Sequence, residues 1–215
     1  MSRFLLTAAG IAFLSCGASA ITISDNLGNA VASTEFVGGD TWVAAEFATD
    51  GTLYTLSSIT LLLETETPGT ARLDLYTDSG SKPGTLLGTL ISPSIPSTLL
   101  PAVFGGNGIA LQPNSLYWAV LNAPSGGFAW GWTESSSGTG AGFLHTWGAT
   151  DDAGASWFTG DIEPLLLNVS VTFVTTGPGP ADGVPEPGSF GLLAFFGLPA
   201  LALLVMRSGA PKNAR

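Results

Sequence analysis

The sequence predicts an all-β protein whose main domain is an antiparallel, two-sheet β-sandwich with jelly-roll-like character. Short runs rich in Thr, Val, Leu and aromatic residues alternate with clusters of Gly, Pro, Asn and Asp; the 215-residue chain holds 29 Gly and 14 Pro. Such regularly spaced strands and turns are typical of sandwiches and barrels. No amphipathic helical pattern occurs between residues 21 and 176. The fold class follows from these two observations and from the alternation described next.

Several runs alternate with the period of two that a half-buried strand requires. In "ARLDLYT", Leu73 and Leu75 share one face, while Arg72, Asp74 and Tyr76 share the other. The first face is expected in the core and the second in solvent. The expected strands are Trp42–Ala48, Leu56–Leu63, Ala71–Thr77, Leu86–Ile91, Leu116–Leu121, Phe128–Thr133, Phe143–Trp147 and Leu165–Phe173.

The N-terminus, residues 1–20, has the three parts of a secretory signal peptide. Arg3 supplies the positive start, a short apolar stretch follows, and Ala18-Ser19-Ala20 forms an A-x-A cleavage site. We expect cleavage after Ala20 and therefore an exported chain. Cys16 is the only cysteine, and its lipidation is a less favoured alternative because the residues before it fit a lipobox poorly. After cleavage at Ala20 the domain would contain no thiol.

The C-terminus reads as a linker, a membrane span and a basic tail. Residues 177–187 alternate Pro and Gly, which favours an extended linker. Residues 188–206 are an uncharged apolar run that is long enough for one transmembrane helix. Residues 207–215 contain Arg207, Lys212 and Arg215, so the positive-inside rule places this tail in the cytoplasm and the domain of residues 21–176 outside the membrane.

The charge of the predicted domain is strongly negative. Arg72 and Lys82 are its only basic residues other than a histidine, and the whole chain holds 16 acidic residues against six basic ones. Nucleic acid and anionic lipid surfaces repel such a domain. Nucleic acid is therefore excluded as a partner, whereas neutral glycans and divalent cations are compatible with the charge.

The order of Pro185-Glu186-Pro187, an apolar run and an arginine-containing tail resembles the PEP-CTERM sorting signal of Gram-negative bacteria. This resemblance implies an exosortase as a partner during export. It also implies at least transient anchoring in the inner membrane, followed by delivery to the cell surface or extracellular matrix, often in association with exopolysaccharide. The alternative is an ordinary C-terminal anchor whose linker happens to contain the tripeptide.

The segments "ARLDLYTDSGSKPGTLLGTL" (71–90) and "FAWGWTESSSGTGAGFLHTWGATDDAGASWF" (128–158) are similar to the choice-of-anchor domains, most closely type R. The resemblance covers most of residues 36–176. It implies a β-rich module that is directed to the surface and brings no catalytic residues.

Four tryptophans in residues 128–158 are candidates for a glycan-binding surface. Trp130 and Trp132 share one face of an expected strand, and Trp147 and Trp157 follow. Flat aromatic faces can stack on sugar rings, which would make the domain a glycan-binding module. Burial in the core explains the same alternation and is the favoured interpretation.

Acidic residues leave two further hypotheses open. Asp151 and Asp152 lie in a Gly-containing loop that could hold calcium with help from Asp161 or Glu163, although a solvated turn is favoured. Other cofactors are not expected.

A pair such as Glu134 with Asp161 or Glu163 could hydrolyse glycosides. His145, the only histidine, lacks the partners of a triad or a zinc site, so a structural role is favoured. The leading expectation is therefore an exported, non-enzymatic surface or matrix protein. A glycan-binding module is the alternative, and a secreted glycoside hydrolase is less favoured.

Overall fold

The computed structural model describes residues 19–174, which form an all-β domain without a helix. Its strands belong to one antiparallel sheet of 11 strands. The all-β and antiparallel predictions are confirmed. The strands are β1 (Ile21–Asp25), β2 (Ser33–Val37), β3 (Trp42–Ala48), β4 (Tyr54–Asp78), β5 (Pro83–Thr89), β6 (Leu100–Gly105), β7 (Ala110–Leu111), β8 (Leu116–Trp132), β9 (Phe143–Thr150), β10 (Phe158–Gly160) and β11 (Leu167–Phe173).

The strands follow the order β1-β11-β4-β8-β3-β9-β10, with β2 paired to β8 and with β5, β6 and β7 paired to β4. The first and last strands are therefore neighbours, and Ile21 lies opposite Val171. Strands β9 and β10 form the other end of this order, and Phe158 pairs with Ala149 there.

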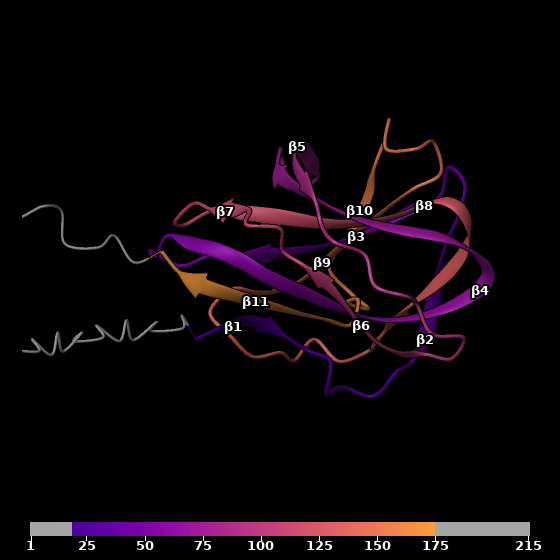
Figure 1. Cartoon of the computed structure of the whole chain (residues 1–215), viewed down its shortest axis with the longest axis horizontal. Coiled ribbons are helices and arrows are strands. Elements are labelled where there is room, and N and C mark those ends of the chain that lie inside the picture. The colour runs from indigo at the N-terminus through magenta and orange to yellow at the C-terminus, as the bar shows by residue number, and fades with distance from the viewer. Residues whose placement is uncertain (1–18, 175–215) are drawn as a thin grey trace, which may run out of the picture. The chain divides into compact units, whose positions relative to one another are not determined.

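Two long strands, β4 and β8, organise the domain. The sequence predicted each of them as two separate strands, Leu56–Leu63 with Ala71–Thr77 and Leu116–Leu121 with Phe128–Thr133. Instead, the pairing of β4 with β8 continues through three irregularities between Thr65 and Arg72. Pro68 and Gly69 lie in the exposed middle of β4, where the missing amide hydrogen of proline leaves no ladder bond unmade. Both strands curve back at the same end of the domain (Figure 1).

Glycine is required where the two strands cross closely at this bend. A Cβ on Gly69 would lie 2.1 Å from the Ser125 carbonyl oxygen, and Gly126 has a φ of 75° with backbone atoms of Thr67 and Gly69 against it. No L side chain fits there without moving the backbone. Gly69 and Gly126 therefore mark a bend within continuous strands.

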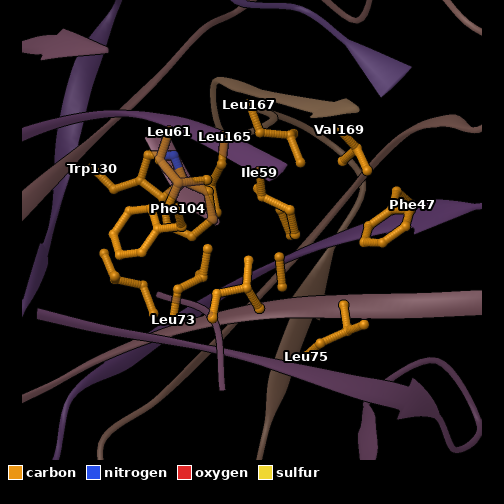
Figure 2. Packing of buried hydrophobic residues seen from close by; sticks show 14 of the residues in the cluster. Phe47, Ile59, Leu61, Leu73, Leu75, Phe104, Trp130, Leu165, Leu167 and Val169 are labelled. Carbon is orange, nitrogen blue, oxygen red and sulfur yellow. The ribbon is translucent and has the colours of Figure 1, made fainter. Parts of the chain in front are cut away.

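One hydrophobic core receives side chains from both halves of β4. Leu61, before the bend, and Leu73 and Leu75, after it, are fully buried together with residues of β6, β8 and β11. Figure 2 shows this cluster around Phe104, Trp130 and other labelled residues. The predicted inward face of "ARLDLYT" is confirmed.

The opposite face of the same segment is partly buried, in contrast to the prediction, with Asp74 buried and Arg72 and Tyr76 half-buried. Asp74 is 2% exposed and its carboxylate accepts hydrogen bonds from Arg72 Nε at 2.9 Å, Thr89 Oγ1 at 2.6 Å and Asn122 Nδ2 at 2.9 Å. These three donors replace the hydrogen bonds to water that the Asp74 carboxylate loses on burial, so the desolvation cost of burying its charge is offset.

A second, smaller hydrophobic cluster continues this outward face. Ala44, Trp118 and Val120 are fully buried, and Trp42, Tyr76 and Trp157 pack against them. The aromatic side chains of neighbouring strands and of the loop before β10 thus cover a face that alternation alone assigned to solvent.

The remaining strand predictions succeeded unevenly. Trp42–Ala48 coincides with β3, while the strand expected at Leu86–Ile91 starts earlier, at Pro83. The turn before it is made by Gly80 and Ser81, both with positive φ, which is the requirement for a two-residue hairpin turn. Strands β1, β2, β6, β7 and β10 were not predicted.

Candidate functional site

Trp130, one of the four tryptophans suggested for a glycan surface, is a core residue. It is fully buried, and its indole N–H donates to the Leu166 carbonyl oxygen at 2.9 Å. Its ring lies among the labelled core side chains in Figure 2. Trp130 is therefore removed from the candidate surface, since no ligand can reach it without unfolding the core.

Trp132 and Trp147 instead line one surface pocket together with Glu35, Glu163 and Leu165. We call this recess, of about 70 Å³, the tryptophan–carboxylate pocket. Both tryptophans are half-buried and pack against the edge of the main core. The pocket combines aromatic faces with two carboxylates at one place on the surface.

Three strands and one loop build this pocket. Trp132 ends β8 and Trp147 lies within β9. Glu35 comes from β2, where it pairs with Trp130, and Glu163 comes from the loop between β10 and β11. Glu35 was not predicted as a site residue, because its strand was not predicted and its pocket partners are distant in sequence.

Backbone hydrogen bonds hold the loop that carries Glu163 against the tryptophans. Trp132 and Leu165 form an isolated antiparallel bridge, and the Thr133 N–H donates to the Pro164 carbonyl oxygen at 3.1 Å. The indole N–H of Trp147 donates to the Ile162 carbonyl oxygen at 2.6 Å. This bond fixes the ring of Trp147, so its π face, rather than its N–H, is what remains for a ligand.

The electrostatics of the pocket are anionic. Burial raises the pKa of Glu35, and the nearby carboxylate of Glu163 raises it further. Within residues 19–174 the only ion pair joins Arg72 to Asp74, so neither glutamate has a basic side-chain partner in this part of the chain. A positive group in the pocket would relieve the repulsion between the two carboxylates.

A second, wider pocket is linked to the first by one contact between their lining side chains. It measures about 500 Å³ and is lined by Thr41, Ala149, Thr150, Asp151, Ser156, Trp157 and Phe158. The ring of Phe158 contacts the ring of Trp147 edge-on, with centroids 5.7 Å apart. Trp157, which the sequence grouped with the other tryptophans, belongs to this Trp157 pocket, and it also packs against the outer cluster.

The loop suggested for calcium is organised by its own hydrogen bonds. The carboxylate of Asp152 accepts from Thr150 Oγ1 at 2.5 Å, Ser156 Oγ at 2.6 Å and the Ser156 N–H at 2.9 Å. These bonds, with those from Ser156 first, lower the pKa of Asp152 to about 2. Among the described residues, no three His, Cys, Asp or Glu side chains are grouped as metal ligands. The geometry gives Asp152 a role in holding its turn.

The other titratable candidates lie apart from this pocket. Glu134 lines a different surface recess, with Ala30, Val31, Ala32, Thr133 and Ser135. His145 is an exposed residue of β9. The carboxylate pair that shares a pocket is therefore Glu35 with Glu163, rather than Glu134 with either suggested partner.

The sorting candidates lie outside the described residues. These are Pro185, Glu186, Pro187, Arg207, Lys212 and Arg215, together with residues 1–18 of the expected signal peptide and the span of residues 188–206. Between residues 19 and 174 there is no helix capable of crossing a membrane.

No family model, no curated protein and no solved structure matches this chain.

Proposed function

We propose that this chain is an exported, non-enzymatic surface or extracellular-matrix protein that an exosortase sorts through Pro185-Glu186-Pro187. The observation that carries the proposal is the position of the β domain between the two address segments. Strand β1 begins at Ile21, directly after the expected cleavage point, and β11 ends at Phe173, just before the Pro/Gly linker of residues 177–187. The protein would pass through the inner membrane and reach the surface or matrix.

The sorting proposal is tested by comparing where the full chain and variants accumulate in a host that contains an exosortase. Truncation after Gly183 and Glu186→Ala should both abolish surface delivery, because each removes part of the signal. Asp182→Ala is the matched control, since it removes a carboxylate from the same linker outside the tripeptide. Unchanged surface display of the truncated chain would refute the proposal.

We further propose that the sheet forms a jelly-roll-like sandwich of two layers. The bend in β4 and β8 supports this arrangement, because residues before and after the bend bury their side chains in the same core. Such sandwiches are common scaffolds for exported recognition modules, but a scaffold does not itself specify a ligand.

Binding of exopolysaccharide is the activity that the surface of the domain supports best. The contact between Trp147 and Phe158 joins two pockets lined by aromatic, hydroxyl and carboxylate groups. A polymer of sugars needs such successive stacking positions. Trp147→Ala should therefore weaken binding of the native exopolysaccharide by the full chain in titration calorimetry. Phe173→Ala, which removes an exposed aromatic ring from β11, should not.

The hydrolase alternative makes a different prediction at the same pocket. Two carboxylates beside a sugar site are the equipment of glycosidases, and Glu35, with its raised pKa, would be the acid. The non-enzymatic proposal expects no new reducing ends when the full chain is incubated with the polysaccharide. Reducing ends that disappear with Glu35→Gln would assign hydrolysis instead.

A further inference from the structure

The tryptophan–carboxylate pocket is too small for a whole sugar chain and carries two carboxylates without a basic partner in the described residues. Its volume of about 70 Å³ suits a small substituent and the carbon that bears it. Its lining offers two indole rings, the carboxylates of Glu35 and Glu163, and the side chain of Leu165. The substituent must therefore be polar, compact and preferably positive.

We infer that this pocket binds the protonated amine of an amino sugar, so that the preferred exopolysaccharide contains hexosamine units without an N-acetyl group. This inference rests on the proposed polysaccharide-binding function and names the chemistry of its ligand. The amine enters the small pocket, while neighbouring sugar rings occupy the wider Trp157 pocket beyond Phe158.

The indole rings favour a cation on physical grounds. An ammonium within about 6 Å of an indole centroid is attracted by the negative face of the ring. Trp147 is held in place by its hydrogen bond to Ile162, and therefore little ordering of this ring is needed on binding.

The carboxylates supply the discrimination between charged and neutral sugars. An ammonium offers three donors to Glu35 and Glu163, and charge-assisted bonds of this kind are stronger than neutral ones. An N-acetyl group has one donor and a larger acyl group. An N-acetyl group in the pocket would leave oxygens of Glu35 or Glu163 without a hydrogen-bond donor in a partly desolvated site. The site therefore selects against the acetylated sugar.

The charge of the domain agrees with a cationic ligand. Every acidic residue of the chain except Asp182 and Glu186 lies in residues 19–174. The two basic side chains there are Arg72, which pairs with Asp74, and Lys82, which lies in the turn between β4 and β5. A polycation would be attracted to this domain at long range, and the attraction would weaken with salt.

The experiment measures binding of the full chain, purified in detergent, to glucosamine oligomers and to N-acetylglucosamine oligomers of equal length. The glucosamine oligomer should bind about tenfold or more tightly, the size expected for one charge-assisted contact. Glu163→Gln and Glu35→Gln should each reduce that affinity about tenfold without changing the weak binding of the acetylated oligomer.

Glu134→Gln is the matched control, because it removes an exposed carboxylate two residues from Trp132 that lines a different recess. It should leave the affinity unchanged. Thermal unfolding of each variant establishes that it is folded. If the Glu35→Gln variant does not fold, the Glu163→Gln variant, at a more exposed position, provides the test by itself.

Each other outcome overturns the inference. Equal binding of both oligomers, or unaltered binding by Glu163→Gln, would refute amine binding in this pocket and leave the proposed polysaccharide binding intact. Tighter binding of an oligolysine peptide than of the glucosamine oligomer would assign the pocket to a basic peptide. Loss of all sugar binding with intact surface sorting would remove the glycan ligand and retain the exported surface protein.

Discussion

Trp130→Ala should destabilise the domain severely, although the sequence placed Trp130 beside Trp132 as a candidate ligand contact. The side chain is fully buried in the main core and donates a hydrogen bond to the Leu166 carbonyl oxygen. Removing a buried aromatic ring costs about 3–5 kcal/mol through lost burial and the cavity left behind. The Leu166 carbonyl oxygen keeps a hydrogen bond from the Leu62 N–H at 3.3 Å, so loss of the indole donor adds only the net worth of one hydrogen bond, about 0.5–1.5 kcal/mol.

The two effects overlap, and we expect a total loss of about 5 kcal/mol, a large part of the ~5–15 kcal/mol of a typical domain. Trp130→Phe separates them, because it keeps most of the apolar ring and removes the donor. Its cost should be about 2–3 kcal/mol, since the smaller ring adds a smaller cavity to the lost hydrogen bond. Trp147→Ala should cost less than Trp130→Ala, since the Trp147 ring is only half-buried.

Equilibrium unfolding in urea provides the measurement. Circular dichroism should follow the transition, because removal of a tryptophan changes the fluorescence signal of the remaining ones. The expected order of stability is wild type, Trp147→Ala, Trp130→Phe, then Trp130→Ala. A Trp130→Ala midpoint equal to that of the wild type, or equal losses for Trp130→Ala and Trp147→Ala, would refute the assignment of Trp130 to the core.

Three further predictions address the bend, the calcium candidate and the outer face. Gly69→Ala should lower the free energy of unfolding in urea, because the new Cβ would meet the Ser125 carbonyl oxygen. Gly28→Ala, which has open space around its Cβ, should instead raise it by about 0.4–1 kcal/mol. The reverse order of stability would contradict the close crossing of β4 and β8. The pKa of Asp152, held at about 2 by Ser156 and Thr150, is below its ordinary value, so its stabilising effect is present above about pH 4 and is lost as the pH falls toward 2. Asp152→Asn should flatten an acid titration of the melting temperature in that window, and an unchanged titration would argue against the turn. Burial, with a further contribution from Asp78, raises the pKa of Glu46. The protonated form therefore stabilises the fold, and this stabilisation is lost as the pH rises through the raised pKa. Glu46→Gln should melt at a higher temperature than wild type at pH 8, and a lower melting temperature would contradict the direction of the shift.

The sequence was sufficient to predict the strands that alternate strictly. Leu73 and Leu75 face the core as expected, and β3 coincides with its predicted range. The bend could not be predicted, because Pro68 and Gly69 normally end a strand, and only the partner strand shows that pairing resumes beyond them. The local sequence pattern shows which residues share one face of a strand, but it does not show which other strand pairs with it.

The candidate site was predictable only in part for the same reason. Two of the four selected tryptophans, Trp132 and Trp147, meet in one pocket, while Trp130 is buried and Trp157 lies in the second, wider pocket. Glu35 was missed because Glu163, with which it lines the pocket, is far from it in the sequence. Alternation could not distinguish Trp130 from Trp132, because both share one face of β8, although the first is fully buried and the second only half-buried.

The pairing of the first described strand with the last has a consequence for folding if the chain is exported as we propose. A chain threaded through a translocation channel N-terminus first would expose β1 at the start and β11 near the end, yet each strand needs the other to complete the sheet. Ile21 would remain without its ladder partner until Val171 had crossed. Closure would therefore be postponed until almost the whole domain was outside, and an incompletely translocated chain would stay open to chaperones and proteases.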